Sequence, residues 1–526
     1  MAKIIDNLII GSGPAAFAAA IALRRLGQNF EVLDAGYDLE PERAAKSREM
    51  SRVSPSAWSP EDVAFLFPPP VASTAGVEQR LAFGSNFPYR TPDPLSIVTE
   101  DCKIDVSHGF GGFANVWGAA VLPASDNDLA DWPVDIAAMR DSYRNVSAYV
   151  NLSGADDALR GPFPMDPWSM GTLDKSLQAV RLINFFNTKA EKLSAAGITT
   201  GTATVAVNSS RNINTCRYCG YCLDGCVYGS IFNPQFGWEA LAQEGRVIHR
   251  PFYALEFKEE TGLVRVNAIH LKDGTTVEFT AKRLFLGLGA IASTRLVARS
   301  LALLNLPIKL LDSQYFFFPM LSLAGVENPM RFTLAELFVE ILNPKISSHF
   351  VHFQVYGINS IFKDALGKML PAFMRKMTLP IEKRFYLFQG FLHSADSGHL
   401  VMNLVSSNAG RDDVSIRGVA NPKSLSVVLD SQRLLRRALL PFGIIPPFYV
   451  KTVPLGRSFH IGGSFPMGGS QGPLTSDLMG RPAGLQRVHL VDASTFPSIP
   501  ATTITYTIMA NADRVVSLTV AALSER

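Results

Sequence analysis

The sequence contains few cysteines and few charged residues for its length, and it has no long apolar run. Only five of its 526 residues are cysteine, which argues against a dispersed disulfide framework and favours a reducing compartment. Charged residues make up 18% of the chain and the formal net charge is +3, so neither nucleic acid nor an acidic substrate is indicated as a partner. No stretch reaches the roughly 18 consecutive apolar residues that a membrane-spanning helix needs.

The N-terminal stretch is apolar, but it does not have the pattern of a signal peptide. It lacks a basic start and a small-residue cleavage site, and a glycine turn interrupts it. The sequence therefore predicts a cytoplasmic protein. Its length suits two or three domains, or one large two-part enzyme, with ample chain for a buried core.

The first forty residues predict a strand, a tight turn, a helix and a second strand. Residues 7–10 form a short apolar run, residues 15–26 are rich in alanine and leucine, and residues 30–33 return to an extended apolar pattern. This order is typical of the first unit of a dinucleotide-binding fold.

A G-x-G-x-x-A motif lies at the turn between the first strand and the helix. Gly11 and Gly13 would let the backbone approach a pyrophosphate at the helix N-terminus, and Ala16 replaces the third glycine, where only a small side chain is needed. Asp34, at the end of the second strand, is placed to bind ribose hydroxyls. These residues predict a dinucleotide site without separating FAD from NAD.

The rest of the chain shows three more patterned regions and two without a nucleotide signature. Glycines at 109–112 indicate a close approach of backbone to a ligand, residues 247–286 have the alternation and the "KDG" turn of a β-meander, and the chain from 488 reads as strand, proline turn and long helix. Residues 35–100 read as an irregular excursion, and residues 311–454 are rich in aromatics.

Four separated stretches resemble the glucose–methanol–choline (GMC) oxidoreductases, FAD enzymes that oxidise alcohols and sugars. They are "IIGSGPAAFAAA", "GFGGFANVWGA", "RLFLGLGAIASTRLV" and the C-terminal "HIGGSFPMGG…VHLVDASTFPSIPATTITYTIMANADR". The resemblance implies an α/β fold, α+β overall, with a Rossmann-like FAD-binding domain and an inserted substrate domain of antiparallel sheet plus helices. The expected FAD-binding domain comprises residues 1–125, 205–310 and 455–526, with a cysteine loop at 214–230. The expected substrate domain comprises residues 126–204 and 311–454.

The resemblance also implies a set of cofactor contacts spread over the chain. Ala254 would offer backbone to the adenine, Asn115 and its neighbours would run beside the flavin, and Asp492 would meet the ribityl–pyrophosphate part. The turn at Thr502 would aim a helix N-terminus at the flavin edge where negative charge develops on reduction. The expected cofactor-binding residues are Gly11, Gly13, Ala16, Asp34, Gly111, Gly112, Asn115, Ala254, Gly289, Asp492, Ala493 and Thr502.

Oxidation of an alcohol requires a hydride to leave carbon and a proton to leave oxygen. The flavin accepts the hydride, and an imidazole suits the proton because its pKa lies near neutrality. His460, in "RSFHIGGS", occupies the family's catalytic position and is the expected general base. The family's second histidine or asparagine falls on Thr503 here, whose hydroxyl can donate one hydrogen bond but cannot replace an imidazole.

Four of the five cysteines lie in "CRYCGYCLDGC". Their C-x2-C-x2-C-x3-C spacing is the ferredoxin run with Val227 in place of the usual proline. Five cysteines cannot ligate two clusters, which leaves one [4Fe–4S] cluster, one [3Fe–4S] cluster, or a cluster completed by Cys102. Zinc or reduced structural thiols remain alternatives, and zinc usually takes its ligands from two separated pairs. The four expected metal ligands are Cys216, Cys219, Cys222 and Cys226.

A cluster would make the protein a dehydrogenase, because it passes electrons singly to an external acceptor such as a protein or a quinone. Some GMC dehydrogenases resemble this chain in having cysteines at the corresponding place. Residues 361–388 combine apolar side chains with six basic and two acidic residues. This segment could be a substrate lid, or it could lie on a membrane surface, peripheral to the inner membrane, for a lipid-linked substrate or a quinone.

The sequence therefore predicts an FAD-dependent dehydrogenase that oxidises a hydroxyl of a sugar or other alcohol. Two alternatives remain open at this point. One is an electron-transfer flavoprotein without an alcohol substrate of its own, and the other is an enzyme that reduces a carbonyl in the reverse direction.

Overall fold

The structure is a computed structural model of the chain. It describes residues 3–69, 79–165, 170–210, 214–326, 332–357, 383–406, 412–445, 450–469 and 472–524. No helix within these ranges is long and apolar enough to cross a membrane. Residues 361–382 of the basic segment lie outside the described residues, so the interpretation of that segment as a lid or a membrane contact is not addressed by the fold.

The first part of the fold is a seven-stranded sheet in the order β7-β2-β1-β10-β9-β8, with β21 also paired to β10. β7, β2, β1, β10 and β21 are parallel, whereas β8, β9 and β10 form the antiparallel meander that the sequence predicts. Its strands are β1 (Ile4–Ile10), β2 (Glu31–Leu33), β7 (Val247–His249), β8 (Phe252–Glu260), β9 (Leu263–His270), β10 (Thr276–Leu286) and β21 (Val488–Leu490). This sheet confirms the Rossmann-like prediction.

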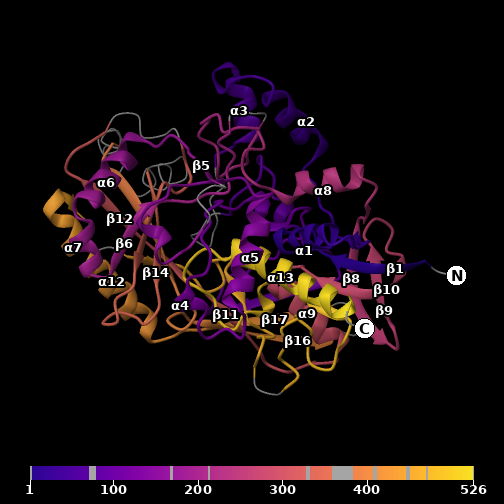
Figure 1. The fold of residues 1–526 in the computed structure, drawn as a ribbon. Helices are drawn as coiled ribbons and strands as arrows, with labels where there is room; N and C mark the ends of the chain where they lie inside the picture. Colours follow the sequence, from indigo (N-terminus) through magenta and orange to yellow (C-terminus); the bar gives the residue numbers. More distant parts are fainter. Residues whose placement is uncertain are drawn as a thin grey trace.

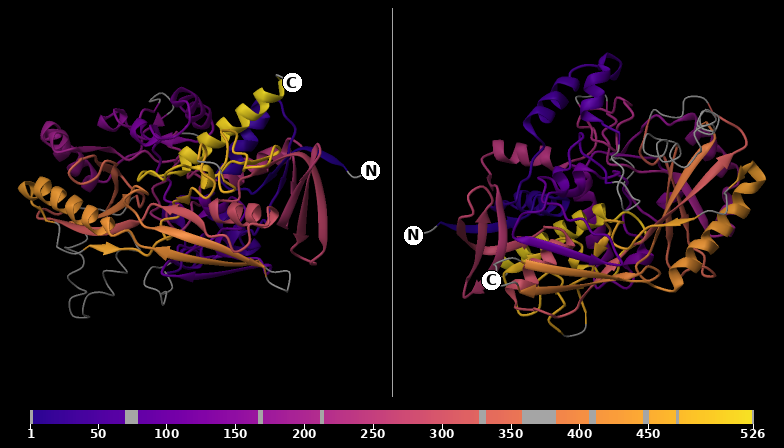
Figure 2. Two further views of the ribbon diagram at one scale, coloured as in Figure 1. Left: turned by 90° about the horizontal axis from the view of Figure 1, so that it is seen from below. Right: turned by 180° about the vertical axis from the view of Figure 1, so that it is seen from behind.

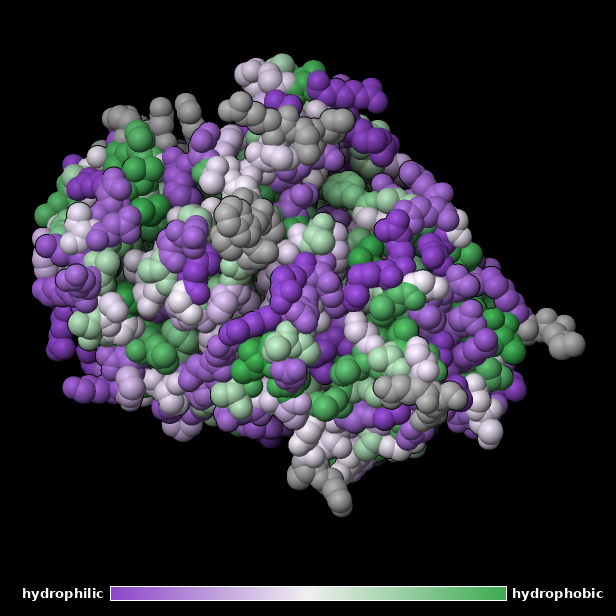
Figure 3. Space-filling model, in the orientation of Figure 1, coloured by the Kyte–Doolittle hydropathy of each residue, from purple (hydrophilic) through white to green (hydrophobic). Residues whose placement is uncertain are grey.

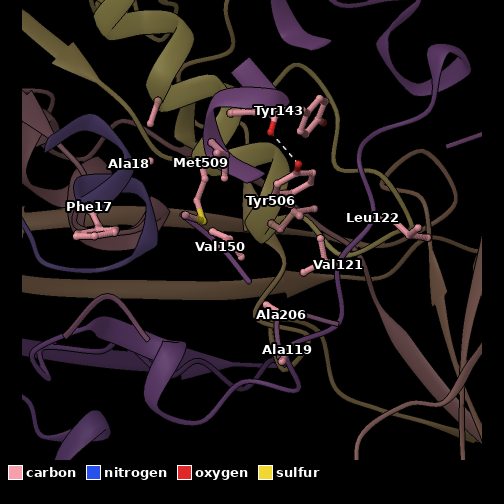
Figure 4. Close-up of a cluster of buried hydrophobic side chains, with 14 of the residues drawn as sticks. Phe17, Ala18, Ala119, Val121, Leu122, Tyr143, Val150, Ala206, Tyr506 and Met509 are labelled. Carbon is pink, nitrogen blue, oxygen red and sulfur yellow. Dashed lines mark hydrogen bonds between the residues drawn. The ribbon is translucent and has the colours of Figure 1, made fainter. Parts of the chain in front are cut away.

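Helices cover both faces of this sheet, as the alternation of its strands requires. Ile9 packs with α1 (Pro14–Arg25) and α13 (Thr505–Ser524), whereas Leu8 and Ile10 face α9 (Ala290–Ser300). Figure 4 shows Phe17 of α1, Met509 of α13 and Val150 converging in the first of these cores. In the same core the hydroxyl of Tyr506 donates to the backbone oxygen of Tyr143 on α5 (Ile136–Ser147) at 2.8 Å.

The second part contains a seven-stranded antiparallel sheet in the order β18-β12-β15-β14-β13-β6, with β19 also paired to β12. Helices α6 (Leu177–Thr188) and α12 (Lys423–Leu439) pack on one face of it. Figure 2 shows α12, in orange, along the outer side of this sheet, far from the meander β8–β10. The strands are β6 (Ile198–Thr202), β12 (Tyr315–Ser322), β13 (Leu337–Ile341), β14 (Val351–Tyr356), β15 (Phe385–Leu392), β18 (Ile444–Ile445) and β19 (Lys451–Thr452).

A five-stranded sheet in the order β20-β11-β16-β17-β3 links the two parts. Its strands are β3 (Leu95–Glu100), β11 (Ile308–Asp312), β16 (His399–Ser406), β17 (Asp412–Val419) and β20 (Ile461–Gly462). Because β11 and β20 pair here directly, the chain returns from the second part to the first at the strand that follows residue 460. The remaining described α-helices and strands are α2 (Pro41–Met50), α3 (Pro60–Leu66), α4 (Asp126–Leu129), β4 (Leu152–Ser153), β5 (Met170–Gly171), α7 (Ala190–Ala195) and α8 (Pro234–Gln243).

The interpretation of residues 35–100 as irregular is wrong in part, because α2, α3 and β3 lie within it. Both helices begin with proline at the first helical position, where its fixed φ favours a helix start. The Ser59 hydroxyl caps α3 by accepting from the backbone N–H of Asp62 at 3.0 Å. These helices are short and polar, so the 3.6-residue apolar pattern that reveals a longer helix is missing. They stand at the top of the molecule in Figure 1.

Candidate active site

The turn after β1 is packed tightly against the end of β10. Gly11 has φ +110° and donates its backbone N–H to Leu33 O at 2.9 Å, and a Cβ at Gly11 would lie 2.5 Å from Gly287 O. Ala16 is packed as closely, because a Cβ on Gly287 would lie 2.8 Å from its backbone nitrogen. Only glycine suits the first of these positions. A Cβ at Gly13, in contrast, would meet nothing nearer than 4.0 Å, which leaves room at the N-terminus of α1.

The predicted flavin loop lies directly beside this turn. Gly111 donates its N–H to the hydroxyl of Ser12 at 3.0 Å, and a Cβ at Gly112 would lie 3.1 Å from the Cα of Gly13. Asn115 holds the loop closed by donating to Phe110 O at 2.9 Å and to Gly112 O at 2.8 Å. The structure therefore brings two of the four resembling stretches together, as a shared nucleotide requires.

Asp34 lies buried at the end of β2. It accepts from Gly36 N at 2.8 Å and from the hydroxyl of Ser12. Burial raises the pKa of its carboxyl to about 7, against the lowering effect of these hydrogen bonds and of Arg250. Hydroxyl donors on a bound ribose would favour the charged form. Ala254 is buried on β8, whose Phe252 donates its N–H to Asp34 O at 2.9 Å.

A second group of predicted residues surrounds the start of α9. Asp492 accepts from Gly289 N and from Ser494 N, each at 3.0 Å. Ala493 O accepts from Gly463 N at 2.9 Å, which ties this turn to the segment carrying His460. Thr502, which precedes α13, is buried, and its Oγ1 has no hydrogen-bond partner among the described residues. Such an atom fits a polar ligand group beside it.

Replacing Gly11 with alanine should remove FAD from the protein. The left-handed φ and the contact with Gly287 O together should cost about 2–5 kcal/mol of unfolding free energy. Gly27→Ala is the matched control, since Gly27 also has positive φ but a Cβ there meets no atom within 4 Å. The measurements are flavin absorbance per protein and denaturant unfolding. Equal flavin content in the two variants would contradict the packing argument.

His460 is half-buried and lies between the two parts of the fold. Its backbone N–H donates to the Ser458 hydroxyl at 3.0 Å and its O accepts from Ser313 N at 3.2 Å. Its ring stacks on Phe391 of β15, with centroids 5.1 Å apart, and its Nδ1 has no partner among the described residues. Burial, followed by the charge of His352, lowers the pKa of His460 to about 3. The imidazole is therefore neutral at neutral pH and able to accept a proton.

The glycine loop and the His460 segment are in contact. Phe459 precedes His460, and its ring lies 4.9 Å, between centroids, from the ring of Phe113 in the loop of residues 111–115. Thr503 lies buried nearby along the C-terminal turn, and its Oγ1 accepts from Leu122 N at 3.1 Å. Thr503 thus anchors the backbone of residues 119–122 and offers no imidazole.

Sequence reasoning missed a buried acid–histidine pair in the second part of the fold. The Nδ1 of His352 on β14 lies 2.6 Å from Oε1 of Glu340 on β13, and both side chains are fully buried. Burial raises the pKa of Glu340. The available signal was an ionisable residue inside each of two largely apolar runs, "LFVEI" and "VHFQVY".

The four clustered cysteines line one recess. It has about 340 Å³ of free space, part of it open to solvent, and its wall also includes Phe332 and Leu334. Burial raises the pKa of Cys216 and of Cys219 to about 12. Within the described ranges, no three His, Cys, Asp or Glu side chains converge as ligands of a metal ion. The alternative of a cluster completed by Cys102 is not favoured, because that thiol lies elsewhere and donates to Ile416 O at 3.4 Å.

Comparisons with known proteins agree with this site. Residues 449–512, which include His460, Asp492 and Thr503, match the model of the GMC oxidoreductase family. A pyridoxine 4-oxidase from Mesorbium loti has a similar structure, with a TM-score of 0.60 at 14% identity over 98% of this chain and 99% of that one. A formate oxidase variant from Aspergillus oryzae RIB40, studied for its FAD modification, has a TM-score of 0.61 at 12% identity over 100% of this chain and 99% of that one. No curated protein sequence matches.

The fold, the nucleotide turn and the matched region define an FAD-dependent oxidoreductase. More particularly, residues 449–512 form a GMC oxidoreductase C-terminal domain.

Proposed function

We propose that the protein is a dehydrogenase that oxidises a hydroxyl of a sugar or other alcohol to a carbonyl, with His460 as the base. The observation that carries this proposal is the neutral, half-buried His460, whose enclosed Nδ1 has no partner among the described residues, next to the glycine loop expected at the flavin. The family match supports an alcohol-type substrate. Bound FAD supplies a two-electron acceptor for the hydride.

Cofactor binding, proton transfer and positioning are assigned to residues of this chain. Gly11, Gly13 and Ala16 would hold the pyrophosphate, Asp34 would hold the ribose, and Gly112 would run beside the flavin. The turn at Thr502 would face the flavin edge. His460 would take the hydroxyl proton, and Thr503 would anchor the loop beside it. The domain boundaries expected from the sequence are part of this proposal, with the second sheet as the substrate side.

Anaerobic mixing of the purified flavoprotein with a panel of sugars and alcohols tests the proposal. A true substrate bleaches the flavin absorbance, because electrons enter the bound cofactor. The alternative, an electron-transfer flavoprotein, would show no bleaching with any alcohol yet would be reduced by a reduced protein or a quinol donor.

We also propose that the four clustered cysteines hold an iron–sulfur cluster that passes electrons to an external acceptor. Four thiols around one recess are the donor set that such a cluster needs. Burial raises the pKa of Cys216 and Cys219, so these thiols would bind as thiolates only beside the positive charge that a cluster would supply.

Peripheral membrane contact is the last part of the proposal. Exposed apolar side chains gather where the basic segment joins the fold: Arg384 donates to Leu323 O, and Leu323 is 63% exposed. Leu177 and Val180 on α6 are exposed as well, and Figure 3 shows hydrophobic residues at the upper left, where α6 lies. Arg181 of α6 donates to Ala324 O at 3.0 Å, so these residues form one surface.

Leu323→Asp should weaken binding to anionic liposomes by about tenfold, because an inserted leucine is replaced by a charge that the surface repels. Val98→Asp is the control, since Val98 is equally exposed, at 64% against 63%, on a different sheet. Co-sedimentation at low salt measures the bound fraction. If the unaltered protein stays wholly in the supernatant, the membrane contact is wrong.

A further inference from the structure

A row of side chains crosses the second sheet and faces His460. In register, Tyr315 of β12 pairs with Phe391 of β15, Phe391 with His352 of β14, and His352 with Glu340 of β13. Directly paired residues lie on the same face of a sheet. The adjacent residues Val339 and Phe353 pack in the core beneath α6 and α12. The row therefore lies on the opposite face, toward the FAD-binding part.

Packing of the neighbouring residues supports the same orientation. Phe338, two positions from Glu340 and so on its face, packs in the core that contains α1 and α13. Its ring centroid lies 4.9 Å from that of His352.

His352 and His460 are neighbours across this interface. Both imidazoles contact Phe391, with centroid distances of 5.9 Å for His352 and 5.1 Å for His460. The two rings interact electrostatically, since the charge of His352 contributes to the lowered pKa of His460. A substrate at His460 would therefore be separated from the Glu340–His352 pair by no more than the ring of Phe391.

Two buried polar atoms of the pair lack partners. Nδ1 of His352 and Oε1 of Glu340 bind one another at 2.6 Å, whereas Nε2 of His352 and Oε2 of Glu340 have no partner among the described residues. Both side chains are fully buried, and a buried polar atom without a partner is unfavourable. The carboxylate accepts from Nδ1, and a hydroxyl, which both donates and accepts hydrogen bonds, can pair with Nε2 as well as with Oε2. Two unpartnered atoms in one buried pair therefore suit a ligand hydroxyl.

We propose that the Glu340–His352 pair binds a second hydroxyl of the substrate, next to the one that reacts at His460, and so selects polyols over simple alcohols. The inference rests on the proposed function and narrows its substrate class. His352 touches the second hydroxyl through Nε2, and Glu340 both orients His352 and accepts through Oε2. No bond is made or broken at this pair. Its role is to fix the substrate so that the reacting hydroxyl meets His460.

The test uses the best polyol from the anaerobic panel and its analogue with the neighbouring hydroxyl removed. For the unaltered enzyme, kcat/KM for flavin reduction should favour the polyol by about 100-fold or more, because the analogue leaves buried polar atoms unpaired. His352→Phe and Glu340→Gln should reduce that ratio to within about threefold of one. Each ratio is measured within one variant, so a loss of folded protein does not affect it.

A matched pair of substitutions separates a substrate contact from a structural role. His352→Gln retains a polar group at the position of Nε2, whereas His352→Asn retains one only at the position of Nδ1, which faces Glu340. The inference expects the glutamine variant to keep most of the discrimination and the asparagine variant to lose it. A merely structural His352 would give the reverse order.

The outcomes separate a failure of this inference from a failure of the proposed function. Bleaching by alcohols without preference for the polyol, or equal ratios in His352→Phe and the unaltered enzyme, would overturn the inference alone. A preference for an amino analogue over the polyol would also overturn it, since the pair would then recognise a cation. Failure of every alcohol to bleach the flavin would overturn the proposed function and the inference with it.

Discussion

Substitution of His460 by alanine is expected to slow the reduction of bound flavin by substrate by a factor of about 10²–10⁴, the usual contribution of a positioned acid–base group. The imidazole is half-buried and neutral, and its enclosed Nδ1 has no partner among the described residues. No second imidazole follows in the C-terminal turn, where Thr503 accepts from Leu122 N. The proton of the substrate would then have to leave through solvent, which the enclosure of this ring nitrogen opposes. FAD content should be unchanged.

The control for this substitution is a buried histidine that the reaction does not use. His489 stacks on Phe285 with centroids 5.0 Å apart and binds Met479 O through Nδ1 at 2.9 Å. His489→Ala should lower stability while leaving the rate per bound flavin within about threefold. Rapid anaerobic mixing measures the rate, and absorbance gives the flavin content. Equal losses in the two variants would show that His460 acts only through the fold.

The nucleotide half of the site was predictable because its signals are local. Gly11, Gly13, Ala16 and Asp34 lie within 24 residues of one another, and each is dictated by a strand, a turn or a helix start in the same stretch. The resemblance then supplied distant members such as Asp492, which accepts a hydrogen bond from Gly289 N in the structure.

The substrate half could not be predicted, since its residues meet only through strand register. Glu340 and His352 are twelve positions apart and lie on paired strands, and His460 reaches them from a segment more than a hundred positions later. A register shift of one residue would turn Glu340 to the other face of the sheet. Composition shows that the strands are apolar, but it does not show which face a lone polar residue occupies.

Substitution of Cys222 by alanine is expected to abolish iron binding and with it the transfer of electrons to one-electron acceptors. Cys222 lies in the middle of the four-cysteine run and lines the recess, and burial raises its pKa. An iron–sulfur cluster needs at least three of these thiolates, and most need all four. Loss of one of these ligands should therefore abolish binding of the cluster rather than merely weaken that binding.

The expected pattern separates the cluster from the flavin. In the Cys222→Ala variant, bleaching of the flavin by substrate should stay within about threefold, whereas reduction of an external acceptor should fall by about 100-fold or more, because the one-electron path is gone. Cys102→Ala is the matched control. Cys102 follows β3 in the chain, and its thiol donates to Ile416 O. The substitution should leave both rates and the iron content unchanged.

Analysis of iron, acid-labile sulfide and zinc in anaerobically purified protein distinguishes an iron–sulfur cluster from a zinc ion at the four cysteines. About three to four iron atoms per chain with matching sulfide are expected. One zinc per chain and no sulfide would replace the cluster by a structural metal, and acceptor reduction would then be the same in Cys222→Ala and Cys102→Ala. The recess supports the cluster because it gathers four thiols. Burial raises the pKa of Cys216, Cys219 and Cys222, so holding them together as thiolates requires the several positive charges that a polynuclear iron centre carries.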